Sequence, residues 1–90
     1  MDTQKFTGFI KTIDYKHMPV GYEKKVVTLK MPDRQRCFIE FRNASSYEVL
    51  NDYQEGDHVE ITALMEGKIS GASGITYNNI VAVSIKKVTN

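Results

Sequence analysis

Alternation of apolar and polar residues with a period of two runs through most of this chain, and it limits the fold more than any other feature. In residues 36–42, Cys37, Ile39 and Phe41 alternate with residues that are mostly charged. Successive side chains of a β-strand point to opposite faces of the sheet, so this spacing predicts a strand with one face in a core. Similar patterns mark residues 5–15, 23–31, 58–66 and 77–88. We therefore expect an all-β domain of five strands.

The first of these segments shows two signs of a strand that bends. Phe6, Gly8 and Ile10 fall on one face, with Phe9 on the other, whereas Ile13 is out of phase with Ile10. A glycine inside a strand, followed by a change of phase, is typical of a β-bulge or of the corner of a barrel. The segment therefore predicts a long, curved strand.

The alternation is broken once, between residues 44 and 53. Ser45 and Glu48 have capping-box spacing, and Tyr47 and Leu50 supply an apolar stripe close to the period of a helix. We expect one short helix here, between the third and fourth strands. This order of elements predicts a five-stranded Greek-key barrel of the OB type. An SH3-like barrel is the main alternative, but it does not normally insert such a helix at this point.

Size and composition restrict the kind of function. The chain has 90 residues, which we interpret as one domain, residues 1–90, with a thin core that favours surface binding over an enclosed catalytic cavity. A single cysteine, Cys37, cannot form an internal disulfide, and we expect it in the core. No apolar run is long enough to span a membrane, and the first residues lack a secretory signal, so we expect a cytoplasmic protein.

Charge is distributed unevenly although the net charge is only +1. Lys and Arg outnumber Asp and Glu in residues 1–42, and the reverse holds in residues 43–90. Nucleic-acid-binding domains often concentrate positive charge on one face. Ordinary surface variation is the alternative explanation, and charge alone does not decide between them.

Four segments carry a resemblance to a known family, namely residues 6–10 (FTGFI), 37–41 (CFIEF), 55–59 (EGDHV) and 77–82 (YNNIVA). They resemble the bacterial single-stranded-DNA-binding OB proteins. They are still more similar to small relatives such as the primosomal replication protein and an uncharacterised Bacteroidetes OB family. The resemblance covers almost the whole chain and implies an OB fold and binding of single-stranded DNA. Proteins of this family commonly stack bases on Trp, and this chain has no Trp.

An OB fold binds nucleic acid across the outer face of its second and third strands and the adjoining loops. That binding needs cations for the phosphates and aromatic rings for the bases. Phe38 is the most specific candidate, because an aromatic in phase with Arg36, Glu40 and Arg42 does not belong to the core. The full set of candidate binding residues is Phe9, Lys11, Tyr15, Tyr22, Lys24, Lys30, Arg36, Phe38, Arg42 and Tyr77.

Signatures of enzymes are weak in this sequence. His17 and His58 stand apart from any Cys/His group with metal-ligand spacing, and no phosphate-binding loop of the Walker type occurs. The carboxylates of Glu55 and Asp57 are typical of a turn. We therefore expect no catalysis, no metal and no cofactor.

The function predicted from these residues is sequence-tolerant binding of single-stranded DNA in replication, recombination or repair, through the outer face of the first three strands. The alternative is an OB module for protein–protein interaction or oligomerisation that does not bind nucleic acid. RNA binding is a third possibility that the sequence leaves open. We also expect a homo-oligomer, a dimer or larger, because pairing would lengthen the track available to a DNA strand.

Overall fold

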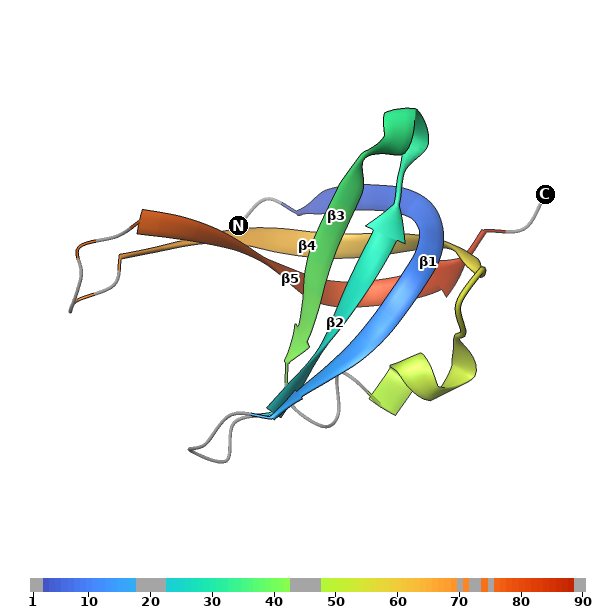
Figure 1. Ribbon diagram of the computed structural model, residues 1–90, viewed down its shortest axis with the longest axis horizontal. Coiled ribbons are helices and arrows are strands. Elements are labelled where there is room, and N and C mark those ends of the chain that lie inside the picture. The colour runs from blue at the N-terminus through green and yellow to red at the C-terminus, as the bar shows by residue number, and fades with distance from the viewer. Residues whose placement is uncertain are drawn as a thin grey trace.

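The computed structural model is a closed barrel of five strands (Figure 1). It describes residues 3–17, 23–42, 48–69, 71, 74 and 76–88. The strands are β1 (Gln4–His17), β2 (Glu23–Lys30), β3 (Arg36–Arg42), β4 (His58–Ile69) and β5 (Thr76–Lys87). Their order around the barrel is β1-β2-β3-β5-β4, and β4 closes it by pairing with β1. Neighbouring strands are antiparallel except for β3 and β5, which are parallel. The predicted OB-type barrel is confirmed.

Gly8 lies where β1 passes from one neighbour to the other. The first half of β1 pairs with β4 and the second half with β2, and Phe9 takes part in both registers. A Cβ atom at position 8 would lie 2.7 Å from the backbone oxygen of Lys30, so only glycine fits this close approach. A shift of register between Ile10 and Thr12 follows. The predicted corner is therefore at Gly8, and the bulge comes just after it.

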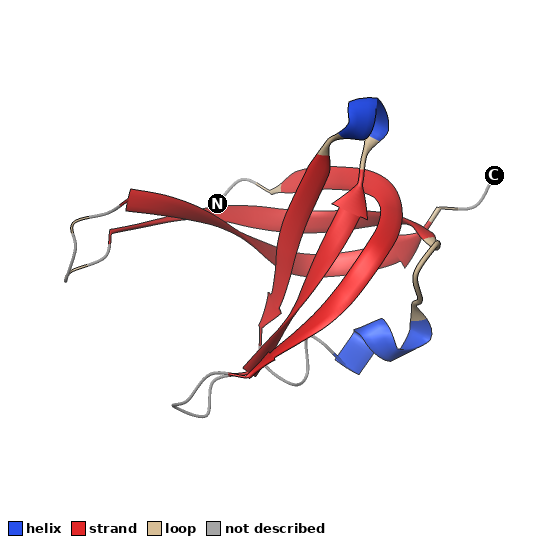
Figure 2. Cartoon of the chain, in the orientation of Figure 1, coloured by secondary structure: helices blue, strands red, loops and turns tan. Residues whose placement is uncertain are grey.

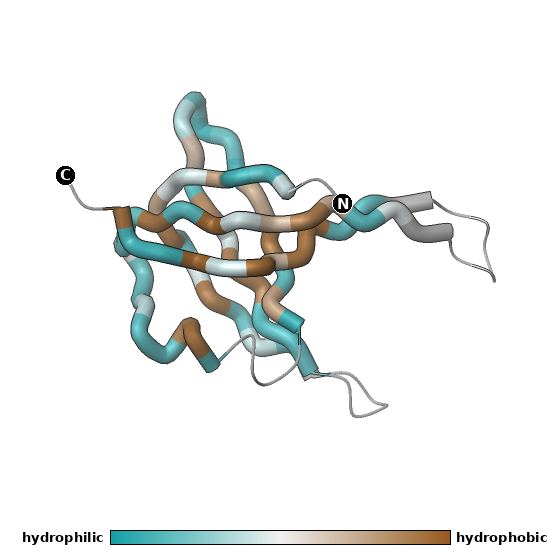
Figure 3. Tube along the Cα trace, turned by 180° about the vertical axis from the view of Figure 1, so that it is seen from behind, coloured by the Kyte–Doolittle hydropathy of each residue, from teal (hydrophilic) through white to brown (hydrophobic). Residues whose placement is uncertain are grey.

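The core is formed by the inward-pointing residues of the alternating pattern, and Figure 3 shows apolar and polar positions alternating along the strands. Cys37, Ile39 and Phe41 of β3 are all buried. Burial raises the pKa of the Cys37 thiol, which favours the neutral, unreactive form. The complete set of buried apolar residues is Ile10, Val27, Leu29, Cys37, Ile39, Phe41, Leu50, Val59, Ile61 and Ala63.

The segment between β3 and β4 contains a 3-10 helix, η2 (Glu48–Asp52), at the end of the barrel away from the β2–β3 turn (Figure 1, Figure 2). The predicted short helix between the third and fourth strands is present as η2, which is of the 3-10 type, and residues 43–47 lie outside the described part. Within η2 only Leu50 is buried, whereas Val49 is exposed. Leu50 is therefore the residue of η2 that packs into the core at this end of the barrel.

Three hydrogen bonds hold the remainder of this segment. The hydroxyl of Tyr53 donates a hydrogen bond of 3.3 Å to the backbone oxygen of Ile85. The backbone N–H of Ile10 donates to the oxygen of Asp57 at 2.9 Å, and the N–H of Gly56 donates to the oxygen of Ile10 at 2.8 Å. These bonds fix the start of β4 beside the bend of β1.

Among the described residues, no helix has the length and apolar character needed to cross a membrane.

Candidate nucleic-acid interface

Four outward-facing residues form a continuous row across four strands. His58 of β4 is the register partner of Phe9, Phe9 is the partner of Lys30, and Lys30 is the partner of Arg36. Adjacent strands are about 4.8 Å apart, so the row extends roughly 14 Å across the outer surface. It exists because β1 bends at Gly8, which lets one residue, Phe9, be a neighbour of both β2 and β4.

The aromatic part of this row is already stacked. The rings of Phe9 and His58 lie 4.4 Å apart between centroids at an interplanar angle of 15°. Phe9 remains 51% exposed despite this contact. Two aromatic planes that are parallel, exposed and held on rigid strands form a platform on which a nucleobase can stack.

Phe38 supplies a second exposed aromatic surface. It lies on β3 opposite Thr28 and is 60% exposed, the largest exposed fraction among the exposed hydrophobic residues of the described chain. The sequence-based expectation that Phe38 faces outward is therefore confirmed. Burying an aromatic ring is favourable, so a ring left in water on a rigid strand indicates a surface built for contact.

Four cations surround these rings: Lys11, Lys30, Arg34 and Arg36. All four are exposed, and none forms an ion pair with a carboxylate in the described part of the chain. Their charge is therefore available to an anionic ligand. We call the set formed by Phe9, Lys11, Lys30, Arg34, Arg36, Phe38 and His58 the cationic track.

Three adjoining hollows run along this track. The first, with a volume of about 620 Å³, lies between the Phe9–His58 stack and the β2–β3 turn. The second lies among the four cations, and the third lies between Phe38 and the residues Asn78 and Asn79 of β5. The first two hollows share Phe9, Lys30 and Arg34, and the second and third share Arg36. The arrangement suits an extended, segmented, anionic ligand rather than a compact one.

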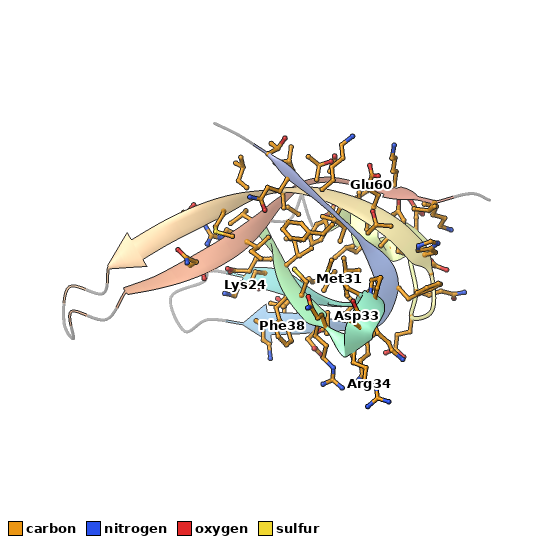
Figure 4. The ribbon with its side chains drawn as sticks, turned by 90° about the horizontal axis from the view of Figure 1, so that it is seen from above. Lys24, Met31, Asp33, Arg34, Phe38 and Glu60 are labelled. Carbon is orange, nitrogen blue, oxygen red and sulfur yellow. The ribbon has the colours of Figure 1, made fainter. Side chains whose placement is uncertain are left out.

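At the other end of the same face the cations are neutralised. The Nζ atom of Lys24 lies 2.6 Å from Oε1 of Glu40, whose Oε2 lies 3.5 Å from Nη2 of Arg42. Arg42 also reaches Glu66 of β4, with 3.2 Å between Nη1 and Oε1. We call Lys24, Glu40, Arg42 and Glu66 the ion-paired cluster. Figure 4 shows Lys24 well apart from Arg34, with Phe38 between them.

The structure separates the ten residues selected from the sequence into groups. Five of them, Phe9, Lys11, Lys30, Arg36 and Phe38, come together in the cationic track. Lys24 and Arg42 belong to the ion-paired cluster, and Tyr15 is 50% exposed further along β1. Tyr22 lies outside the described residues. Tyr77 is in β5, and its side chain is likewise outside the described part.

Two members of the track were missed from the sequence, Arg34 and His58. Arg34 lies in the 3-10 turn η1 (Pro32–Arg34), where Asp33 and Arg34 both have positive φ, 64° and 62°. Pro32 and Asp33 stand between two predicted strands, which is typical of a turn but does not give the direction of the side chain that follows. The sequence shows no metal-ligand partners for His58 and gives it no other role. Its place directly after Gly56 and Asp57, at the start of a predicted strand, is the signal that could have identified it.

Groups that would support metal chemistry do not occur in this part of the molecule. Across residues 3–17, 23–42, 48–69 and 76–88, no three His, Cys, Asp or Glu side chains are arranged so as to hold a metal ion. The chemistry on offer in the track is therefore that of cations, aromatic rings and amides. These groups bind and orient an anionic, aromatic ligand through stacking and charge.

Comparison with known proteins finds likeness in structure rather than in sequence. No family model matches the chain, and no curated protein matches it. Two crystal forms of Rim1, a mitochondrial single-stranded DNA binding protein from S. cerevisiae, superpose with a TM-score of 0.71 at 16% and 17% identity. The alignments cover 99% and 100% of this chain and 97% and 98% of Rim1.

A third solved structure gives the same result. A small single-stranded DNA binding protein from Mycoplasma pneumoniae superposes with a TM-score of 0.62 at 16% identity, over 100% of this chain and 96% of that one. At such low identity the likeness shows that the chain shares their fold. Function has to be argued from the residues of the track.

Proposed function

We propose that this protein binds single-stranded DNA along the cationic track with little dependence on sequence. The observation that supports this most directly is the coincidence of four cations without described carboxylate partners and two exposed Phe rings on the outer face of β1, β2 and β3 and the turn η1 between β2 and β3. This is the face through which OB folds bind oligonucleotides. The solved structures that share its fold are described as single-stranded DNA binding proteins.

Binding would divide between rings and cations. Bases stack on Phe38 and on the Phe9–His58 pair, each stack contributing roughly 1–3 kcal/mol without selecting a base. Lys11, Lys30, Arg34 and Arg36 bind the phosphates and release counterions. A strand bound in this way is held but not chemically changed, so we propose a role in replication, recombination or repair, where single strands are exposed.

The direct test is a salt titration of binding to a fluorescently labelled oligo-dT, followed by anisotropy. Four phosphate contacts predict a slope of log K against log salt of about −2.8, taking about −0.7 per phosphate for single strands. Affinity should fall steeply between about 50 and 200 mM salt. Absence of binding at low salt, or binding that salt leaves unchanged, would overturn the proposal.

A matched pair of double variants locates the site. Arg34→Gln with Arg36→Gln removes two charges from the track and should make the slope shallower by about 1.4. Lys5→Gln with Lys86→Gln removes the same charge elsewhere, since both lysines pair with Glu60 at 3.9 and 3.5 Å. Figure 4 places Glu60 on the opposite side of the molecule from Phe38 and Arg34. Equal losses in the two double variants would mean that only net charge matters.

Self-association is the second candidate function. Met65 of β4 and Val83 of β5 are 51% and 57% exposed, and neither lines the track. Exposed apolar side chains on neighbouring strands suit contact with another protein, including a second copy of the chain. Light scattering at micromolar concentration should give a mass above the 10.3 kDa of one chain, and Val83→Ser should reduce it. A monomer in both cases would exclude this candidate.

A further inference from the structure

We infer that the first hollow of the track holds one guanine base, whose Watson–Crick edge is bound by the carboxylate of Asp33. This inference rests on the proposed binding of single-stranded DNA and adds a base preference at one point of an otherwise sequence-tolerant surface. It follows from the shape of the hollow, from the state of the Asp33 carboxylate and from the donors that each base offers.

The hollow has the shape and lining of a site for one flat aromatic ring. Phe9 and His58 form one wall, and Met31 and Pro32 of the β2–β3 connection contribute further apolar surface. Gly8 also lines the hollow, and its lack of a side chain lets β1 approach Lys30 and Met31 closely. A volume of about 620 Å³ with apolar walls is ample for a purine stacked against the Phe9–His58 pair.

Three charged residues, Lys30, Asp33 and Arg34, also line this hollow, and all three are exposed. Lys30 and Arg34 line it without carboxylate partners and are placed to bind the phosphates that flank an inserted base. Asp33 also lines the hollow. Among the described residues, none donates a hydrogen bond to its carboxylate and none forms an ion pair with it. Figure 4 shows Asp33 beside Met31 and close to Arg34.

A carboxylate in this position restricts what the hollow can receive. It repels phosphate, and an ionised carboxylate can only accept hydrogen bonds. Glu40, the buried carboxylate of the same face, is neutralised by Lys24 and Arg42, so it exerts no comparable effect. Asp33 is exposed to water, and the part of a DNA strand that suits it is a group with donors and no negative charge, which is the edge of a base.

Guanine matches a carboxylate best among the four bases. Its N1–H and N2–H₂ donors are adjacent and can bind both carboxylate oxygens. Cytosine and adenine each present an amino donor beside a ring nitrogen that accepts. Thymine presents one N–H between two carbonyl oxygens that the carboxylate repels. Bidentate contacts of this kind are the ones that discriminate between bases.

The backbone holds Asp33 in place before any ligand arrives. Asp33 has φ 64° and ψ 28°, a left-handed conformation that Asp adopts more readily than most residues. The turn is closed by a hydrogen bond of 2.8 Å from the N–H of Met31 to the oxygen of Gln35, and Pro32 fixes φ at its start. Little ordering of the backbone is then needed on binding, which favours recognition.

The test compares the affinities of three labelled oligo-dT strands, which carry dT, dG or deoxyinosine at one central position. We expect the wild-type protein to bind the dG strand about five- to tenfold more tightly than the dT strand. This is the lower part of the range of base discrimination for a bidentate contact, because the hollow is open to water. Deoxyinosine lacks the 2-amino group, so it should give an intermediate value. Equal affinity for dG and dT would overturn the inference.

Variants of Asp33 separate recognition from turn structure. Asp33→Gly keeps the left-handed backbone without strain and removes the carboxylate, so the dG-to-dT ratio should fall to about one. Asp33→Asn keeps the turn and loses the charge, and should lower the ratio as well. Each variant is judged by its own ratio, because removing a negative charge raises the affinity for every strand. A full preference for dG in Asp33→Gly would overturn the inference.

Arg36→Gln is the matched control. It removes a charge from the track outside the first hollow, so it should weaken binding to all three strands equally and preserve the ratio. This design also distinguishes the two proposals. Binding of all strands with no base preference refutes the guanine site and leaves the proposed function standing, whereas no binding to any strand refutes both.

Discussion

The two ends of the outer face of β2 and β3 carry the same kinds of residue in opposite states. At one end Lys24 and Arg42, which are register partners, are bound to Glu40 and Glu66. At the other end Lys30 and Arg36 are also register partners, and no described carboxylate pairs with either. Each end of the face has one Lys of β2 and one Arg of β3, so the number of cations alone does not distinguish the two ends. Their availability to an anionic ligand differs completely.

The difference arises from neighbours contributed by other strands. Glu66 is far from Arg42 in sequence, and it arrives because the β4–β5 hairpin extends past the end of β3, where β5 pairs with Glu40 through Val81. The other end borders the bend of β1 and the β2–β3 turn, which contribute Lys11 and Arg34. The end with the ion-paired cluster therefore binds the β4–β5 hairpin to β3, and the end with the cationic track is available to a ligand.

Replacing Glu40 with Ala should have the largest effect, because it abolishes the difference between the ends. The Glu40 side chain is 10% exposed, and Lys24 and Arg42 are 25% and 20% exposed. Removing one partner of a buried ion pair costs roughly 3–5 kcal/mol, and some water contact here reduces this to about 2–4 kcal/mol of unfolding free energy. Urea denaturation measures it.

The same variant should make the salt slope of binding to oligo-dT steeper, since Lys24 and Arg42 become available to phosphate. Glu40→Gln keeps the shape of the side chain and should show the change in slope with a smaller loss of stability. An unchanged slope in a folded Glu40→Gln protein would show that the DNA does not reach this end.

Phe38→Ala should have the next largest effect, and only on binding. Loss of one stacked base should weaken the affinity for oligo-dT by about 1–3 kcal/mol and leave the salt slope unchanged, because no charge is removed. Phe38 is 60% exposed, so the unfolding free energy should change by less than about 0.5 kcal/mol. Val49→Ala, which truncates an exposed side chain of η2 outside the track, serves as control and should bind as the wild type does.

Comparison of Lys30→Ala with Lys24→Ala gives the smallest effect and the most direct contrast of the two ends. Both lysines are on the same face of β2, but only Lys24 is ion-paired. Lys30→Ala should make the salt slope shallower by about 0.7, and Lys24→Ala should leave it nearly unchanged. Equal changes of slope in the two variants would contradict the division of the face into a neutralised and an available end.

Gly8 offers a test of how the available end is built. A Cβ atom there would press on the backbone oxygen of Lys30, so Gly8→Ala should lower the unfolding free energy by about 1–3 kcal/mol. It should also separate Phe9 from Lys30 and weaken binding to oligo-dT in the fraction that remains folded. Gly71→Ala, with open space around the added atom, is the control and should change neither property.

Prediction from the sequence was reliable for properties that depend only on neighbouring residues in the chain. Side chains alternate across a strand whatever surrounds it, so the inward positions of Val27, Leu29 and Ile39 and the outward position of Phe38 followed from spacing alone. The corner at Gly8 followed in the same way. Capping-box spacing predicted a short helix between the third and fourth strands, but not that its described part would be a 3-10 helix in which only Leu50 is buried.

Sequence by itself determined that this chain forms a five-stranded barrel with cations and aromatic rings on one outer face. Only the tertiary structure decided which of those cations are neutralised, since Glu66 reaches Arg42 across the barrel. Only the tertiary structure placed His58 against Phe9 and turned Asp33 and Arg34 toward the first hollow. The physical reason is that periodicity fixes the face on which a side chain lies, whereas its charge and stacking partners come from strands brought close by closure of the barrel.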